Sequence, residues 1–241
     1  MFAPPSAAGS VVILSGAGLS APSGVPTFRD AGGLWEGNRP EELATPGAWA
    51  RNEALVRRFY DVRRQGTRAA RPNAGHEALV RLQAAWGPQR VALVTQNVDG
   101  LIQRAAAQMG LPVELVEMHG TNERLRCVDP RHPEVEAPVG DSVDQRCARC
   151  GAALRPAVVW FGETPIDMDP IVAAVLRAEV FIAVGTSGVV YPAAGYGQLA
   201  QRRGARTLEI NPIPSGADWF EAVIAQSADQ ALPDLVSAWL S

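Results

Sequence analysis

The chain has 241 residues, of which 47% are hydrophobic and 20% charged, and its formal net charge is −3. This composition is typical of a globular protein with enough apolar side chains for a sizeable core. No apolar run approaches the roughly 18 residues that a membrane span needs, which excludes an integral membrane protein. The small negative charge gives no global reason to expect nucleic-acid binding.

The basic residues are all of one kind, and the cysteines and the first residues bear on the cellular compartment. All 22 basic residues are arginines, and no lysine occurs in the chain. Three cysteines, an odd number, argue against a disulfide framework and for a reducing compartment. The first residues, Met-Phe-Ala-Pro-Pro-Ser, lack the basic and apolar regions of a secretory signal. We therefore expect a cytoplasmic protein that is a monomer.

Short apolar runs alternate with helical patterns along the chain. Buried strands are predicted at Val11–Leu14, Val91–Thr95, Val113–Met118, Val180–Gly185 and Arg206–Asn211. Helices are predicted at Glu53–Arg64, Gly100–Met109, Pro170–Ala178 and Ala231–Leu240. This alternation predicts an α/β fold with a Rossmann-like parallel sheet and helices on both faces. Ligands of such sheets bind beyond the carboxyl ends of the strands.

Two regions interrupt the alternation. Residues 38–80 are predicted to form an arginine-rich helical insertion. Residues 121–153 contain all three cysteines and little apolar periodicity. They can bury little apolar area, so they need an additional local link to hold their structure. We expect both insertions to form a small domain, and residues 1–37, 81–120 and 154–241 to form the main, Rossmann-like domain.

A glycine-rich turn follows the first predicted strand. Gly16 and Gly18 allow the backbone to approach a pyrophosphate, which amides at a following helix start can bind. The dinucleotide fingerprint GxGxxG is not matched, because position 21 is alanine, and a tight turn without a ligand is the alternative. The segment Ser23–Pro26 continues a helix poorly, so we expect Phe28 and Arg29 on an ordered loop over the ligand.

Polar side chains follow two further strands. The amides of Gln96 and Asn97 offer hydrogen-bond donors and acceptors, and Asp99 can accept from a ribose hydroxyl or cap the next helix. His119 ends another strand and is a candidate general base near neutral pH. The alternative for this residue is a buried, hydrogen-bonded histidine.

These segments in this order resemble the sirtuin family of NAD-dependent protein-lysine deacylases. The resemblance rests on the glycine-rich segment from Gly16, the TQNxDG segment at Thr95–Gly100, the HG pair at His119, FGE at Phe161–Glu163 and GTS at Gly185–Ser187. It covers nearly the whole chain from Val11 onward. The family's reaction gives free lysine, nicotinamide and 2'-O-acyl-ADP-ribose, and the resemblance implies this reaction here.

The resemblance also implies roles for individual residues. His119 would be the general base, and Val158, Trp160 and Phe161 would form the channel and edge strand on which an extended acyl-lysine peptide lies. The implied NAD-binding residues are Gly16, Ala17, Gly18, Ser20, Phe28, Arg29, Gln96, Asn97, Asp99, Gly185, Thr186, Ser187, Asn211, Ile213 and Ala228.

A tyrosine and an arginine bear on the identity of the acyl group. Tyr60 and Arg63 are three residues apart and share a helix face. A phenol and an arginine fork can together bind a carboxylate, although the residues alone also fit a solvated arginine-rich face. Tyr-x-x-Arg at this place resembles the class III branch of the family. That resemblance implies removal of succinyl and malonyl groups, with acetyl groups as further substrates in bacterial members.

The cysteines form an incomplete zinc pattern. Cys147 and Cys150 have the spacing of half a zinc site, and Cys127 lies 20 positions before Cys147. The resemblance implies a structural zinc in a zinc-ribbon-like insertion, but the fourth cysteine is missing. His132 or Asp129 could complete the set, water or an outside ligand could, or the metal could be absent. We favour His132, since imidazole is a natural zinc ligand, and we expect the metal to serve folding.

Other activities remain compatible with parts of the pattern. They are a nicotinamide oxidoreductase, a plain NAD-dependent deacetylase, an ADP-ribosyltransferase side activity and a non-catalytic NAD- or acyl-lysine-binding module. The missing GxGxxG disfavours the first, and His119 with Asn97 disfavours the last. We expect an enzyme whose partners are acylated proteins, with no nucleic acid or membrane partner.

Overall fold

The computed structural model describes residues 2–27, 39–142, 144–188 and 190–241. Its strands are β1 (Val11–Ser15), β2 (Val91–Thr95), β3 (Leu115–Glu117), β4 (Gly120–Arg126), β5 (Val135–Glu136), β6 (Arg155–Val158), β7 (Val180–Val184), β8 (Arg206–Ile210) and β9 (Ala222–Ile224). Its α-helices are α1 (Pro40–Leu43), α2 (Pro46–Arg51), α3 (Glu53–Ala69), α4 (Ala74–Trp86), α5 (Leu101–Met109), α6 (Met168–Arg177), α7 (Ala193–Arg202) and α8 (Ala228–Leu240), and two 3-10 turns are η1 (Ala17–Leu19) and η2 (Ala21–Ser23). None of these described helices has the length and apolar character to cross a membrane.

The main sheet has six strands in the order β3-β2-β1-β7-β8-β9, and every neighbouring pair is parallel. In the middle of the sheet, Val11 pairs with Val91 on one side and with Val180 on the other. All five residues of β1 are buried, as expected of a parallel strand covered on both faces. The strand order reverses beside β1, so its carboxyl end lies where such sheets bind their ligands.

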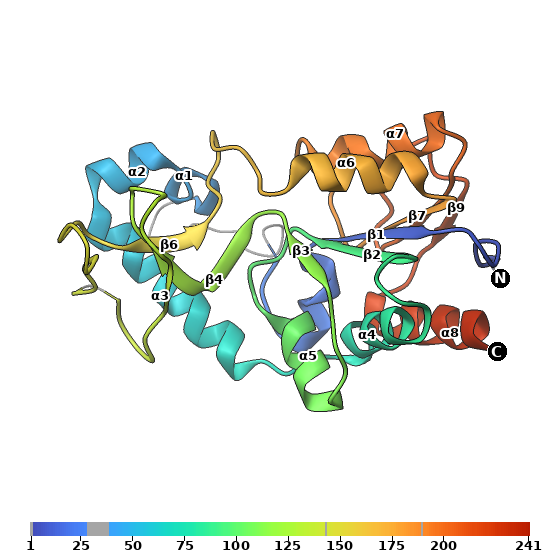
Figure 1. Ribbon diagram of the computed structural model, residues 1–241, viewed down its shortest axis with the longest axis horizontal. Helices are drawn as coiled ribbons and strands as arrows, with labels where there is room; N and C mark the ends of the chain where they lie inside the picture. The colour runs from blue at the N-terminus through green and yellow to red at the C-terminus, as the bar shows by residue number, and fades with distance from the viewer. Residues whose placement is uncertain (1, 28–38, 143, 189) are drawn as a thin grey trace.

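Helices cover the sheet on both sides, with α6 and α7 on one face and α4, α5 and α8 on the other (Figure 1). Side chains of β1 alternate between the two layers: Val11 and Ile13 pack with α4 and α8, whereas Val12 and Leu14 pack with α6 and α7. Burial of each such side chain contributes about 1.5–3 kcal/mol. The predicted α/β fold with a Rossmann-like parallel sheet is thereby confirmed.

The ends of several elements differ from the predicted ones for local reasons. Helix α5 begins one residue later than predicted, because Gly100 has a left-handed φ of +68°. Helix α3 continues past Arg64 to Ala69, and α8 begins at Ala228. Helices α4 and α7 and the short edge strand β9 are not among the predicted elements.

The small lobe lies at one end of the sheet and combines α1–α3 with the strands β4–β6 (Figure 1). Strand β4 pairs antiparallel with β5 and with β6. One apolar cluster lies among α2, α3 and the end of β6, and includes Val56, Phe59 and Trp160. A second surrounds Leu125 and two of the cysteines. Both clusters are small in comparison with those of the main sheet.

Packing suggests domain bounds that differ from the grouping made on the sequence. Helix α4 lies against α5 and α8, and its Leu79 and Leu82 are buried in the core below the main sheet. Strand β6 pairs with β4 in the small sheet. We therefore propose that the helical insertion ends at Asn73, and that the small lobe extends to the end of β6.

Candidate functional site

The loops after β1 and β7 touch backbone to backbone at the carboxyl edge of the main sheet. The Gly18 amide donates to the Gly185 carbonyl at 2.8 Å. A Cβ on Gly18 would lie 2.7 Å from the Gly185 Cα, and Gly185 has a φ of +57°. The glycines of the first loop thus permit contact between the two loops. Ala17, between Gly16 and Gly18 in the sequence, begins η1.

A buried polar chain links the first loop to α4 and to the loop after β2. The Ser20 hydroxyl donates to Asp99 Oδ2 at 2.7 Å, and the other Asp99 oxygen accepts from the Leu101 amide at 2.9 Å. His76 Nδ1 accepts from the Asn73 amide at 3.1 Å, so Nε2 carries the proton and donates to Ser20 Oγ at 3.2 Å.

Burial shifts the pKa values of Asp99 and His76 in this hydrogen-bonded group. Desolvation raises the pKa of Asp99, and the bonds from Leu101 and Ser20 oppose that shift. Desolvation, reinforced by the Arg104 charge, lowers the pKa of His76 to about 4. His76 is therefore neutral at pH 7 and fixes the orientation of the Ser20 hydroxyl. The sequence analysis missed His76; the signal was a histidine three residues after Asn73, in a capping box.

Side-chain amides connect the remaining loops of this edge. Asn97 Nδ2 donates to the Gly16 carbonyl at 3.1 Å and to Ser20 Oγ at 3.2 Å. Gln96 Nε2 donates to Thr186 Oγ1, and Asn211 Nδ2 donates to the Thr186 carbonyl, each at 3.0 Å. The loops after β1, β2, β7 and β8 consequently form one hydrogen-bonded unit, as the carboxyl-edge rule predicts.

His119 lies at the same edge, after β3. Its Nδ1 is 3.1 Å from the Gln96 carbonyl. A carbonyl oxygen only accepts, so Nδ1 carries the hydrogen and Nε2 keeps its lone pair. Burial lowers the pKa of His119, and the bond to Gln96 opposes this. A neutral imidazole with a free lone pair is the form that a general base requires.

Some of the predicted cofactor residues lie apart from this unit. Phe28 and Arg29 fall outside the described residues. Ile213 is 69% exposed on the loop after β8, while Ser187 is half-buried just after β7. Ala228 is buried at the start of α8, and its carbonyl lies 2.9 Å from where a Cβ on Gly75 would be.

Tyr60 and Arg63 lie on α3 as the helical spacing predicts. The Tyr60 ring packs edge-on against Phe59 at 4.9 Å and 6.4 Å from the Trp160 ring. The Arg63 guanidinium lies 5.4 Å from the centre of the Phe59 ring. Desolvation raises the pKa of Tyr60 well above its usual range, opposed by the Trp160 indole and the Arg63 charge. Desolvation also lowers the pKa of Arg63, and Tyr60 and Asp99 oppose that shift.

The predicted peptide-binding segment follows β6 and joins the two lobes. The Val159 amide donates to the His119 carbonyl, and the Phe161 amide donates to the Ala44 carbonyl, each at 2.9 Å. Val158 and Trp160 are buried, whereas Phe161 is 46% exposed. The segment therefore brings His119 close to the lobe that carries Tyr60.

Arg155 and Glu163 fix this segment through contacts with the Trp160 ring and backbone amide. Arg155 donates to Glu163 Oε1 at 2.6 Å and Oε2 at 2.9 Å, and its guanidinium carbon lies 3.4 Å from the centre of the Trp160 ring. Glu163 also accepts from the Trp160 amide at 2.8 Å. Burial alone would raise the pKa of Glu163, but the Arg155 and Trp160 bonds bring it below its usual range. The sequence analysis missed Arg155, although Glu163 belongs to the FGE segment.

The three cysteines and His132 converge in the small lobe. Their ligand atoms all lie within 4.8 Å of one another. His132 Nδ1 is 3.4 Å from both Cys127 Sγ and Cys147 Sγ, and Cys127 Sγ is 3.6 Å from Cys150 Sγ. Around a tetrahedral zinc, S···S and S···N separations are about 3.8 and 3.5 Å, given bond lengths near 2.3 and 2.0 Å. The four residues therefore fit one zinc ion.

Asp129, the other candidate for the fourth ligand, is engaged elsewhere. Its carboxylate accepts from Arg131 Nε at 2.9 Å and Nη2 at 2.7 Å. These bonds lower the pKa of Asp129 to about 2. Of the two candidates, His132 is therefore the one that lies beside the three sulfur atoms, and its role as the fourth zinc ligand stays a prediction.

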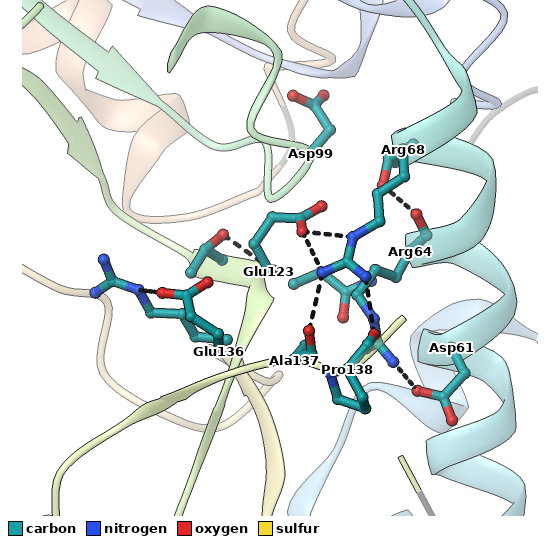
Figure 2. A network of polar contacts seen from close by, with 12 residues as sticks. Asp61, Arg64, Arg68, Asp99, Glu123, Glu136, Ala137 and Pro138 are labelled. Carbon is teal, nitrogen blue, oxygen red and sulfur yellow. Dashed lines mark hydrogen bonds and ion pairs between the residues drawn. The ribbon is translucent and has the colours of Figure 1, made fainter. Parts of the chain in front are cut away.

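An arginine staple, formed by Arg57, Arg64 and Arg68, fastens α3 to the segment 137–142 of the cysteine insertion. Figure 2 shows Arg68 donating to Glu123 at 2.7 Å, to the Pro138 carbonyl at 2.8 Å and to the Ala137 carbonyl at 3.1 Å.

Deeper in this contact, the two other arginines of the staple bind Asp61 and Ser142. Arg64 pairs with Asp61 (Figure 2). Asp61 also accepts from the Ser142 amide and hydroxyl, each at 2.8 Å, and Arg57 donates to the Ser142 carbonyl at 2.7 Å. Arg57, Asp61 and Arg64 are all buried. The helix that carries Tyr60 and Arg63 is therefore positioned by the insertion that carries the cysteines.

Comparison with known proteins gives a consistent set of similarities. The model of the Sir2 family matches residues 16–192. The NAD-dependent protein deacylase 2 of Pyrobaculum aerophilum is 47% identical over 229 residues, which cover 93% of this chain and 89% of that protein. The NAD-dependent protein deacylase of Salmonella typhimurium is 44% identical over 237 residues, which cover 95% and 84%.

Solved structures are similar over the same length. A complex of a Sir2 homologue with NAD aligns with a TM-score of 0.86 at 35% identity, covering 98% of this chain and 92% of that one. A mutant Sir2 homologue in complex with 2'-O-acetyl ADP ribose also aligns with a TM-score of 0.86 at 35% identity, covering 97% and 93%.

Proposed function

The chain belongs to the Sir2 family and is an NAD-dependent protein deacylase, and we propose that it prefers acyl groups with a distal carboxylate, namely succinyl and malonyl. Acetyl groups are the secondary substrate. The observation that carries this preference is the place of Tyr60 and Arg63, which are electrostatically coupled on α3 beside Trp160.

The donor set at the sheet edge fits NAD. Amides, hydroxyls and one carboxylate gather there, and these groups match the carboxamide, ribose hydroxyls and phosphates of a dinucleotide. When bound, NAD supplies an activated ribose from which nicotinamide can leave. We assign Gln96, Asn97 and Asp99 to the nicotinamide and its ribose, Thr186 to the phosphates, and Asn211 to the adenosine.

His119 is the general base of this proposal. The Gln96 carbonyl holds Nδ1–H, so Nε2 is the atom that takes a proton from a ribose hydroxyl. The lowered pKa keeps the ring neutral at pH 7. The bond from Val159 to the His119 carbonyl ties the base to the peptide-binding segment, so a substrate extended along this segment lies beside it.

Tyr60 and Arg63 bind the distal carboxylate of the acyl group. A guanidinium in a largely buried position is stabilised when a carboxylate pairs with it, and such charge-assisted bonds are stronger than neutral ones. An acetyl group offers no charge to this pair. The preference therefore follows from the pairing of charges rather than from the size of the acyl group.

Zinc is assigned to Cys127, His132, Cys147 and Cys150. All four protein ligands are supplied by the chain, which is characteristic of structural rather than catalytic zinc. The ion would hold the insertion that positions α3.

The experiment that tests the proposal is mass spectrometry of a succinyl-lysine peptide and a matched acetyl-lysine peptide, each incubated with enzyme with and without NAD. We expect NAD-dependent loss of succinyl with formation of succinyl-ADP-ribose, faster than loss of acetyl. Turnover of acetyl alone would disprove the carboxylate preference and leave the deacylase.

Variants of α3 sharpen this test. Arg63→Met should lower kcat/KM for the succinyl peptide about 10- to 100-fold, as expected for loss of a charge-assisted bond, and leave acetyl turnover within about twofold. Tyr60→Phe should act in the same direction with a smaller effect. The matched control is Arg58→Met, the same change at an exposed position of α3. An equal loss for both peptides would show that Arg63 has only a structural role.

A further inference from the structure

Both the side chain and the backbone of Trp160 are fixed by contacts with Arg155 and Glu163. Its side chain is buried, with 2% exposure, and the Arg155 guanidinium lies flat enough on it to bring the guanidinium carbon 3.4 Å from the ring centre. Arg155 is itself fixed by two bonds to Glu163, and Glu163 accepts the Trp160 backbone amide. Ring and backbone of Trp160 are therefore positioned by the same ion pair.

The polar atom of this ring is unpaired. Among the described residues, Trp160 Nε1 is buried and has no hydrogen-bond acceptor. Buried donors in native proteins almost always have a partner, so one that lacks a partner needs an explanation. A ligand that brings an acceptor to this atom is such an explanation.

The surroundings of the indole indicate which ligand. The Trp160 and Tyr60 rings are 6.4 Å apart at 32°, and the indole opposes the rise in the pKa of the phenol although the two groups do not meet the geometry of a hydrogen bond. The indole and the phenol thus lie on one aromatic pair, and Arg63, whose guanidinium lies over the neighbouring Phe59 ring, acts on the same phenol. An acceptor with two oxygens is the fitting group for these donors.

We propose that the Trp160 indole N–H is a third donor to the distal carboxylate of the acyl group, and that Arg155 and Glu163 are positioning residues that aim it. This inference rests on the proposed preference for succinyl and malonyl groups and adds a residue that determines it. The indole donates to one carboxylate oxygen, and Tyr60 and Arg63 bind the other lone pairs.

The test is the ratio of kcat/KM for a succinyl-lysine peptide to that for the same peptide with acetyl-lysine. Trp160→Phe keeps an aromatic ring against Arg155 and removes only the N–H and part of the ring. We expect the ratio to fall about tenfold or more, as for loss of one bond to a charged group, because any change that the smaller ring makes to the channel affects both peptides and cancels in the ratio. Trp49→Phe is the matched control, since the Trp49 ring lies 5.7 Å from that of Trp160 in the same cluster.

The outcomes distinguish failure of the third-donor inference from failure of the proposed acyl preference. If the wild type removes succinyl and Trp160→Phe leaves the ratio unchanged, or lowers both rates equally, the third-donor inference is wrong and the proposed preference stands. If the wild type removes acetyl but no succinyl, the preference itself fails and the inference fails with it.

A second variant guards against misfolding of Trp160→Phe. Replacement of Trp160 by β-(3-benzothienyl)alanine exchanges the N–H for sulfur at nearly unchanged volume, and should give the same loss in the ratio. In wild-type protein labelled with 15N at its six tryptophans, a succinyl peptide without NAD should move one indole signal downfield, and an acetyl peptide should not. Absence of a succinyl-specific shift would overturn the proposal without any variant.

Discussion

The main sheet and the small lobe are stabilised by different interactions. In the sheet, β1 is buried along its whole length, with Val11 and Ile13 in one apolar layer and Val12 and Leu14 in the other. In the lobe, the apolar clusters are small, and the contact between α3 and the cysteine insertion depends on arginines, of which Arg57 and Arg64 are buried.

This difference indicates how well each region tolerates a substitution or the loss of a ligand. Apolar burial is non-directional, so the sheet tolerates local change as long as volume and pattern are kept. Buried ion pairs and metal ligands require a particular geometry and are damaged by loss of one partner. If the proposed roles are right, the chemistry of NAD and His119 belongs to the region that tolerates change, and the selection of the acyl group belongs to the region that does not.

Removal of the metal is the strongest way to separate the two regions. The enzyme as purified should contain about one zinc per chain, measured by elemental analysis. A strong chelator should expose residues 121–153 to limited proteolysis while the sheet stays protected, because the apparent free energy of structural zinc binding in small modules is about 10–16 kcal/mol. Equal protection of both regions after chelation would contradict the comparison.

The identity of the fourth ligand can be tested with a matched pair of variants. His132→Ala should lower zinc affinity strongly, whereas Asp129→Asn should retain zinc, because Asp129 pairs with Arg131. The measurement is competition for zinc with a chromogenic chelator. Similar zinc retention in both variants would remove His132 from the set.

A change in the sheet region should abolish the reaction and leave the lobe intact. His119→Ala should lower kcat about 10²–10⁴-fold for succinyl and acetyl peptides alike, as for loss of a general base. Zinc content and binding of the succinyl peptide should be unchanged, and calorimetry would check the latter.

The same residue sets the acid limb of the pH profile. Only neutral His119 can accept a proton, and burial lowers its pKa below the ordinary 6.5. Hence kcat/KM should fall as pH decreases, with a midpoint below pH 6.5, and this limb should be absent from the residual activity of the alanine variant. A midpoint above that value would mean that another group titrates.

The arginine staple offers the smallest and most graded test. Arg64→Met leaves Asp61 buried beside Ser142 without its guanidinium, and loss of one partner of a buried pair costs about 3–5 kcal/mol. Arg68→Met removes a pair with Glu123 whose side chains are 30% and 29% exposed, and should cost about 1 kcal/mol or less. Hydrogen exchange of the lobe would measure both, and equal effects would contradict the assignment of the staple's energy to its buried part.

Local patterns were sufficient to predict five of the six strands of the main sheet and the edge where its ligands bind. Strands β1, β2 and β7 are mostly apolar runs, and the carboxyl-edge rule brings Gln96, His119 and Thr186 together from positions far apart in the sequence. The exposed character of Ile213 and the burial of Ala228 depend on loop paths, which such patterns do not determine.

Contacts between distant segments were beyond prediction from patterns. Ser20 and His76 are 56 positions apart, and Arg57 and Ser142 are 85 apart, so no periodicity connects them. Likewise, the choice of His132 over Asp129 follows from where the loop places Arg131. In each case a polar side chain is committed by a partner that only the folded chain supplies.

The cations of the arginine staple and of the Arg155–Glu163 pair are guanidinium groups, and this has a chemical consequence for an enzyme that works among acylated amines. Reactive acyl donors are attacked by the neutral amine form of lysine, and the amide that forms can no longer carry the positive charge of the side chain, but this protein has no lysine. The cations that hold its lobe together are thus inert toward the very modification that it removes from other proteins. Its architecture keeps its charge pattern in surroundings rich in acyl donors, and amine-directed labelling reagents would leave its side-chain contacts unaltered.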